Sequence, residues 1–219
     1  VETFTSTTGC VGLPVELPIT VSPTIPGVTV SGPTAVCNGE TGVIYSVPDN
    51  LGSTYSWVVP AGASITSDPN LHQISVNFSM AVTGPVSVVE SSGTGCTKVH
   101  DPITVVVRPL PTVYNLTAPA AYCAGDPGVT ITLSNSETGV NYQLYNSLGT
   151  VGAPVPGSTG SALTWTNQTA EVYHVVATRT TSLPLPVTNC VSNMNGTVSV
   201  TVNNIVPGSI GTDHAICEG

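Results

Sequence analysis

The six cysteines of this 219-residue chain follow a repeated pattern. Three of them begin a Cys-x-Gly phrase, "CNG", "CAG" and "CEG": Cys37, Cys123 and Cys217. Each lies 27 positions after a cysteine of a second kind, which follows Gly or Asn in polar sequence: Cys10, Cys96 and Cys190. Three equal spacings indicate a junction of fixed geometry that recurs along the chain, so the repeat sets the size of the folding unit.

The distances between cysteines of one kind give the length of the repeating unit. Successive Cys-x-Gly cysteines are 86 and 94 positions apart, which is typical of a small β-sandwich. We therefore expect complete modules at 27–110 and 111–205. Residues 1–26 are expected to be the C-terminal part of a preceding module, and residues 206–219 the start of a following one. We expect this sequence to be a window on a longer repetitive protein.

The composition predicts an all-β fold. Only 7% of the residues are charged, and the apolar residues come in short alternating runs such as "ISVNF" and "VSVTV", which is the period of a half-buried strand. Turn residues punctuate these runs. The strands expected in the first module are 28–36, 43–48, 54–59, 63–66, 72–78, 85–91 and 102–108. Those expected in the second are 113–122, 129–134, 140–146, 150–154, 161–166, 171–178 and 196–203.

Seven strands in fewer than about 95 residues predict two packed sheets around one core. Large aromatic side chains are expected to fill each core rather than to form a ligand platform. For the first module these are Tyr45, Tyr55, Trp57 and Phe78. For the second they are Tyr142, Tyr145, Trp165 and Tyr173.

Charge excludes several classes of partner. The formal net charge is −9, with only three fixed cations, Lys98, Arg108 and Arg179. Nucleic acid is held by clustered Lys and Arg, so we predict no nucleic-acid binding, and anionic lipid is disfavoured for the same reason. No run approaches the roughly 18 apolar residues of a transmembrane helix, so direct membrane insertion is not expected.

The cysteine content indicates an oxidising compartment, and therefore an extracellular protein. Zinc sites bring their ligands in closely spaced pairs, and the chain has no Cys-x-x-Cys. Disulfides are the better interpretation of the six cysteines.

The stretch from Cys37 to Cys96 resembles a PKD-like module. It has the Cys-x-Gly opening, a Tyr-x-Trp strand at Tyr55 and Trp57, the turn "PAGASI", and the phrase "GPVSVVE" before "GC". The second module resembles the related Ig-like repeats, with "YQLYN" where Tyr-x-Trp would stand. Similar modules occur in very large secreted surface proteins of Bacteroidota, including gliding-motility adhesins exported by the type IX system. The resemblance implies tandem Ig-like/PKD-like β-sandwiches in a linear rod.

No catalytic constellation is visible in the sequence. The four histidines are scattered over strands and junctions: His72, His100, His174 and His214. None lies near a nucleophile motif such as Gly-x-Ser-x-Gly, and the carboxylates are equally dispersed. We therefore predict no enzymatic activity and no cofactor.

Acidic residues near the junctions have two interpretations. Glu40 and Asp126 recur after Cys-x-Gly, where we expect them to cap a turn. Calcium could bind between Asp101 and Glu90, or between Asp213 and Glu218, but each pair would supply only a few oxygen ligands. Because Ca²⁺ takes about six to eight, we predict no metal site.

The pairing of the cysteines follows from the expected strand order. A bond inside each module would join Cys37 to Cys96 and Cys123 to Cys190. However, Cys37 follows the first strand, at the downstream end of its module, and Cys96 follows the sixth strand, at the upstream end. Strands rise about 3.3 Å per residue, which separates them by roughly 30 Å, whereas a disulfide needs Cα atoms within about 7 Å.

The downstream end of one module meets the upstream end of the next, so we predict an inter-module disulfide between Cys37 and Cys190. The remaining cysteines would bond to neighbouring modules, earlier ones for Cys10 and Cys96 and later ones for Cys123 and Cys217. Pairing within each module stays open, because the first strand could begin later or switch sheets.

The leading functional hypothesis is a structural stalk of a long cell-surface adhesin or filament, acting in adhesion or gliding motility. Its expected partners are neighbouring modules of the same chain, with surface polysaccharide or other cell-surface proteins beyond them. The alternative is a carbohydrate-binding or spacer accessory region of a secreted polysaccharide-degrading enzyme. Carbohydrate binding requires exposed, coplanar aromatic rings, for which the candidates are Tyr114, Tyr122 and Tyr145.

Overall fold

The computed structural model describes Thr7, residues 24–180 and residues 189–204. Predictions that concern Cys10, Cys217 and the flanking module fragments lie outside these residues, as do those on His214, Asp213 and Glu218. The described part of the chain contains strands and no helix, and so no helix there is long and apolar enough to cross a membrane. The predicted all-β fold is confirmed.

The first β-sandwich consists of two sheets. One sheet has the strand order β1-β8-β6-β3, with β7 also paired to β6. Its strands are β1 (Ala35–Cys37), β3 (Thr54–Val58), β6 (Gly84–Ser91), β7 (Thr97–Val99) and β8 (Ile103–Arg108). The other sheet has the order β2-β5-β4. Its strands are β2 (Val43–Ser46), β4 (Ala63–Ile65) and β5 (Gln73–Phe78).

The core of the first sandwich follows from the alternation of its strands. In β5, Ile74, Val76 and Phe78 are buried while the residues between them are not. The four aromatic residues predicted for this core are all buried there: Tyr45, Tyr55, Trp57 and Phe78. The indole Nε1 of Trp57 donates a hydrogen bond to the Leu71 carbonyl at 2.9 Å, which satisfies the only polar atom of that side chain.

The second β-sandwich comprises strands β9 to β18. One sheet has the order β13-β12-β15-β16, with β17 also paired to β15; a second has the order β14-β11-β9, and β10 pairs with β18. The bounds of the first five are β9 (Leu116–Thr117), β10 (Ala121–Cys123), β11 (Val129–Leu133), β12 (Asn141–Asn146) and β13 (Gly149–Pro156). The other five are β14 (Leu163–Gln168), β15 (Val172–Thr180), β16 (Asn189–Asn193), β17 (Val198–Ser199) and β18 (Thr201–Asn203).

Three of the four aromatic residues predicted for the second core are buried in it: Tyr142, Trp165 and Tyr173. The prediction was wrong for Tyr145. In β12, Tyr142 and Leu144 point inward, and the period of two therefore places Tyr145 on the outer face. There its ring stacks on His174, with centroids 5.2 Å apart.

The first strand of each sandwich is shorter than predicted. In place of 28–36, the structure has β1, preceded by isolated bridges at Thr29 and Ser31. In place of 113–122, it has β9 and β10, on either side of Pro119. Pro33 and Pro119 have no N–H to donate to a ladder, which explains the interruptions.

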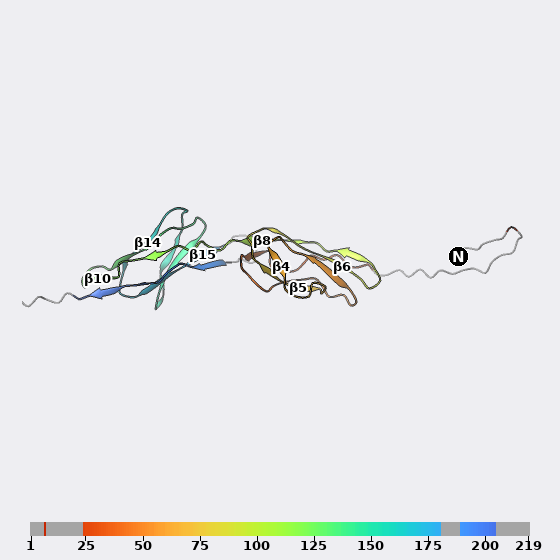
Figure 1. Ribbon diagram of the computed structural model, residues 1–219, viewed down its shortest axis with the longest axis horizontal. Coiled ribbons are helices and arrows are strands. Elements are labelled where there is room, and N and C mark those ends of the chain that lie inside the picture. The colour runs from red at the N-terminus through yellow and green to blue at the C-terminus, as the bar shows by residue number, and fades with distance from the viewer. Residues whose placement is uncertain (1–6, 8–23, 181–188, 205–219) are drawn as a thin grey trace, which may run out of the picture.

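Figure 1 shows the two sandwiches one after the other along the long axis of the view, the first with β4, β5, β6 and β8, the second with β10, β14 and β15. Both have a parallel pair of the same kind, β1 beside β8 and β10 beside β18. In each pair a strand from the beginning of the sandwich lies parallel to the last strand of the same sandwich. The chain thus enters a sandwich at one end and leaves it at the other.

Candidate functional site

The two sandwiches are joined by a disulfide between Cys37 and Cys190, whose Cα atoms are 5.6 Å apart. Cys37 is the last residue of β1 in the first sandwich, and Cys190 belongs to β16 in the second. Cys190 is fully buried. The structure pairs the two cysteines that the strand order paired, and the alternative bond from Cys37 to Cys96 is not the one formed.

The position of Cys37 is fixed by its own strand and by the turn that follows. Cys37 lies opposite Arg108 of β8, and the next N–H, of Asn38, donates to the Arg108 carbonyl at 2.7 Å. The Glu40 carboxylate accepts the N–H of Cys37 at 2.9 Å, and the Glu40 N–H donates to the Cys37 carbonyl at 3.1 Å. The predicted capping role of Glu40 is confirmed, and it holds Cys37 at the downstream end of the first sandwich.

On the other side of the joint, Cys190 lies opposite Arg179 of β15. Cys190 falls between the strands predicted at 171–178 and 196–203, but it belongs to a strand of its own, β16, which pairs antiparallel with β15. Arg179 donates through Nη2 to the Glu137 carboxylate at 2.8 Å, and both side chains are only about 20% exposed. The partial burial reduces solvent screening, which makes this pair stronger than a typical surface ion pair.

Glu137 also binds the linker between the sandwiches. Its carboxylate accepts the N–H of Thr112 at 3.1 Å and the Thr112 hydroxyl at 2.7 Å. The N–H of Glu137 donates to the hydroxyl of the buried Tyr142 at 3.0 Å. One carboxylate therefore ties the linker to β15, and the core of the second sandwich holds that carboxylate in place. The joint has two attachments, the disulfide and the linker.

The upstream end of the first sandwich contains a buried acid, Glu90. Glu90 is fully buried in β6 and accepts hydrogen bonds from Ser53 Oγ at 2.6 Å, Asn50 Nδ2 at 2.9 Å and His100 Nε2 at 3.0 Å. Burial by itself raises the pKa of Glu90, but the hydrogen bonds from Ser53, Asn50 and His100 outweigh it and hold the pKa below its ordinary value. Glu90 is thus a buried carboxylate.

His100 connects this acid to the incoming chain. The N–H of Val28 donates to His100 Nδ1 at 3.4 Å, which leaves the proton on Nε2, facing Glu90. The Val30 N–H donates to the Asp101 carbonyl at 3.0 Å, and the Asp101 N–H to the Val28 carbonyl at 2.9 Å. A cavity of about 190 Å³ lies beside the acid. Its lining includes Thr24, Ile25, Pro26, Asn50, Leu51, Ser53, Glu90 and Ser92.

The two upstream ends share one register. Tyr55 accepts the N–H of Asn50 at 3.0 Å, and Tyr142 accepts that of Glu137 at 3.0 Å, in each case from five residues earlier. Tyr55 and Tyr142 are therefore equivalent, and so are Asn50 and Glu137. The "YQL" of the second sandwich occupies the place of the "YSW" of the first.

This register makes Cys96 equivalent to Cys190. Tyr55 lies opposite Glu90 and Tyr142 opposite Ala177. Two residues further along these strands are Ser92 and Arg179. The Ser92 N–H donates to the Cys96 carbonyl at 2.9 Å, and Arg179 lies opposite Cys190.

Cys123 is in turn equivalent to Cys37. It ends β10 as Cys37 ends β1, and lies opposite Asn203. The following N–H donates to the Asn203 carbonyl at 2.8 Å, and that of Asp126 to the Cys123 carbonyl at 3.0 Å. Cys96 and Cys123 are both exposed and free. The upstream end of one sandwich and the downstream end of the other therefore carry the two halves of the joint.

The remaining candidates do not form a common site. His72 lies 3.4 Å from Asp49, and His174 stacks on Tyr145. Among the described residues no three His, Cys, Asp or Glu side chains gather as a metal site would require. Glu90, considered above for calcium with Asp101, has its carboxylate engaged by hydrogen bonds with Ser53, Asn50 and His100.

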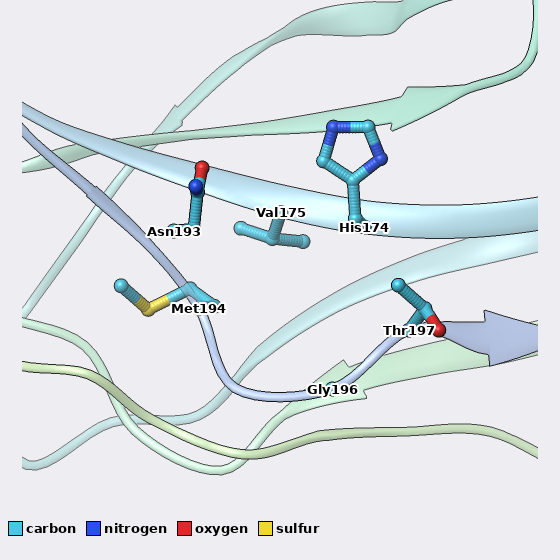
Figure 2. Close-up of a pocket in the computed structure, with 6 residues that line it drawn as sticks. All are labelled: His174, Val175, Asn193, Met194, Gly196 and Thr197. Carbon is cyan, nitrogen blue, oxygen red and sulfur yellow. The ribbon is translucent and has the colours of Figure 1, made fainter.

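The aromatic candidates for carbohydrate binding lie in different environments. Tyr114 and Tyr122 pack against the second core, whereas Tyr145 stacks on His174. An open cavity of about 490 Å³ lies beside His174. Its other lining residues are Val175, Asn193, Met194, Gly196 and Thr197, and Figure 2 shows the His174 ring and the Asn193 amide pointing to the same side.

The sequence patterns did not predict the pairs of ionisable side chains at the joints. Glu90 with His100, and Glu137 with Arg179, are pairs whose members lie 10 and 42 positions apart. Only the strand register brings each pair together. The nearest signal was the position of Asn50 and Glu137, each five residues before a strand tyrosine.

Comparison with known proteins identifies the type of module. The family model of the PKD-like domain matches residues 23–105. No curated protein matches the sequence significantly. The first sandwich is thus similar to a PKD-like domain over nearly its whole length.

Several solved structures align with much of this chain at low sequence identity. The human OSCAR ligand-binding domain is 14% identical, with coverage of 81% of this chain and all of that one, at a TM-score of 0.31. A marsupial T cell receptor is 10% identical, with 79% and 71% of the two chains covered and a TM-score of 0.42. The D00-D0 domain of intimin is 14% identical, with 77% and 99% covered and a TM-score of 0.31.

Proposed function

We propose that this chain is a stalk segment of a long, repetitive cell-surface protein, in which stapled modules hold an adhesive region away from the cell. The observation that supports this most directly is the joint. Domains in one chain move relative to each other by default, but here the Cys37–Cys190 disulfide is a second covalent attachment beside the linker, and Glu137 fixes the linker to the second sandwich. Two attachments restrict bending as one linker cannot.

The cysteine register supports extension of the same joint to neighbouring modules. Cys96 occupies the position in the first sandwich that Cys190 occupies in the second, and Cys123 occupies the position in the second that Cys37 occupies in the first. The same kind of bond can therefore form to a module on either side. By their place in the repeat, Cys10 and Cys217 belong to the same series. The module boundaries at 27–110 and 111–205, and a linear rod of such modules, are part of this proposal.

The proposed location is extracellular, at the cell surface. Disulfides persist in oxidising compartments, and a net charge of −9 favours solubility. The resemblance to gliding-motility adhesins of Bacteroidota extends the proposal to type IX secretion and to a role in adhesion. Neighbouring modules are the proposed partners of these sandwiches, and surface polysaccharide is a proposed partner of the adhesive region beyond them.

Single-molecule energy transfer between dyes on Cys96 and Cys123 tests the stalk. Serine at Cys10 and Cys217 leaves these two thiols as the labelling sites. The oxidised chain is expected to give one narrow distance distribution, and reduction of the disulfide to broaden it. A distribution that is already broad in the oxidised chain contradicts a stiff stalk.

The carbohydrate-binding alternative depends on the stacked pair of Tyr145 and His174, beside the cavity of Figure 2. A glycan array separates it from the stalk. Binding of the chain to an arrayed glycan that is lost in Tyr145→Ala supports the accessory role. Absence of binding to every arrayed glycan supports the stalk. The matched control is Val172→Ala, which shortens an exposed side chain of β15. Tyr114→Ala is unsuitable as a control because Tyr114 packs against the second core.

A further inference from the structure

The Cys37–Cys190 disulfide gives the chain a covalent route that avoids almost all of both sandwiches. We propose that this chain is a tension-bearing element in which a pulling force passes from Cys37 directly to Cys190 and leaves both β-sandwich cores unloaded. This inference rests on the proposed stalk function, since a stalk between a cell and a surface is under tension.

The upstream part of the route is short. The chain comes in along Val28 and Val30, passes through the three residues of β1, and reaches Cys37. Only two members of the first buried core, Val30 and Val36, precede Cys37. All others belong to the part of the chain between the two bonded cysteines.

The downstream part mirrors it. After Cys190 the chain completes β16 and continues through β17 and β18. Only Met194 and Val200 of the second buried core follow Cys190. A force applied to the two ends of the chain therefore reaches strands at the edges of the fold, whereas the segments that build both cores lie in a closed covalent loop.

The size of this loop sets the magnitude of the effect. Cys37 and Cys190 are 153 positions apart, and an extended chain spans about 3.3–3.6 Å per residue. The bond therefore withholds roughly 500 Å of contour length that unfolding of the two sandwiches would otherwise release.

The chain also contains the middle of a second route of the same kind. From Cys96 it runs through β7 and β8, crosses the linker, and passes β9 and β10 to Cys123; in Figure 1 this is the path from the first sandwich through β8 to β10 at the far end of the second. Cys96 and Cys123 occupy the registers of the bonded pair. Along an array of such joints, two covalent routes run side by side, offset by one module.

This arrangement gives a physical reason for the cysteine spacing. The distances from Cys10 to Cys37 and from Cys96 to Cys123 are both 27 positions. Each segment belongs to one of the two routes, 10–37 to the first and 96–123 to the second. The bypassed stretches differ, 59 positions from Cys37 to Cys96 and 67 from Cys123 to Cys190, because a length change there does not alter the route.

Optical-tweezers extension of the whole chain, with handles at its two ends, tests the bypass. A non-reducing peptide map first establishes the bond between Cys37 and Cys190. The oxidised chain is expected to show no step that releases the withheld length, and the same molecule in dithiothreitol to release roughly 500 Å more. Cys37→Ser is expected to behave like the reduced chain without reductant, and Cys96→Ser, which removes a free thiol, like the oxidised wild type.

Several outcomes overturn the proposal. One is a full release of contour length by the oxidised, mapped chain; another is a Cys37→Ser variant that extends like the oxidised wild type. A peptide map that joins Cys37 to Cys96 overturns it as well. The energy-transfer test of the stalk is independent, since a broad distance distribution together with an intact bypass refutes stiffness and leaves the load route standing.

Discussion

Replacement of Glu90 by Gln exchanges one carboxylate oxygen for an amide nitrogen at a site where the neighbours donate hydrogen bonds. Oε1 of Glu90 accepts from Ser53 and Asn50, and Oε2 accepts from Asn50 and His100. The amide of Gln would point its NH₂ at one of these donors. His100 cannot adapt by moving its proton, because its Nδ1 accepts the N–H of Val28.

The expected loss in the free energy of unfolding follows from the hydrogen-bond donors that Glu90→Gln leaves without an acceptor. A hydrogen bond to a charged group contributes about 1.5–3 kcal/mol, and a buried donor without an acceptor costs about 1–3 kcal/mol. These two effects overlap at one site, so we expect Glu90→Gln to lower the free energy of unfolding of the first sandwich by about 2–4 kcal/mol.

Urea unfolding followed by tryptophan fluorescence measures this loss. Trp57 is in the first core and Trp165 in the second, and these are the two tryptophans of the chain. A Trp165→Phe background therefore reports on the first sandwich. The matched control is Asp101→Asn, an exposed carboxylate, which should change the free energy by no more than about 0.5 kcal/mol.

The pH dependence gives the second arm of the test. The folded-state pKa of Glu90 lies below its ordinary value of 4.5, so the ionised group stabilises the fold above that value. The stability difference between wild type and Glu90→Gln should be complete at neutral pH and shrink as the pH falls through the folded-state pKa. A variant that unfolds at the same urea concentration as the Asp101→Asn control would refute the reasoning.

Two further variants probe the joint and the first core. Glu137→Gln removes the ion pair with Arg179 and one of the acceptors of Thr112, and should destabilise the second sandwich by about 1 kcal/mol in urea unfolding; faster hydrogen exchange of the Thr112 amide is the local readout, and unchanged exchange contradicts the linker contact. Gly32→Ala should cost about 1–3 kcal/mol, because the new methyl group would overlap the Tyr45 ring and overpacking of a core is destabilising; the same measurement on Gly39→Ala, where nothing lies within 4 Å, separates this overlap from the backbone preference of glycine.

Much of the fold could be predicted because alternation and turn residues act locally. The strand predicted at 72–78 is found as β5, and that at 102–108 as β8, since apolar residues at every second position define one buried face. The cysteine pairing could be predicted for a different reason. Strand order fixes which end of a sandwich a residue occupies, and the length of a strand then excludes the bond within the first module.

The remaining features depend on contacts between distant segments. β16 has the polar sequence "NCVSN", which carries no alternation of apolar residues, and it is a strand because β15 extends far enough to pair with it. Tyr145 is an aromatic residue of the kind that usually fills a core, but it is adjacent to the inward-pointing Leu144 and therefore points to the other face of the sheet. Glu90 of β6 and Arg179 of β15 are charged residues away from the exposed surface, and their hydrogen-bond partners explain them. These are Asn50, Ser53 and His100 for Glu90, and Glu137 for Arg179.

The two upstream ends use different chemistry at the same positions of the fold. In the first sandwich a neutral Asn50 donates to the buried Glu90; in the second, Glu137 takes the place of Asn50 and accepts from Arg179. The cysteine keeps its register in both. Because backbone pairing fixes that register, the side chains around it can change without displacing the sulfur atom, and a joint that depends on strand register alone can be repeated along a chain whose modules differ in sequence.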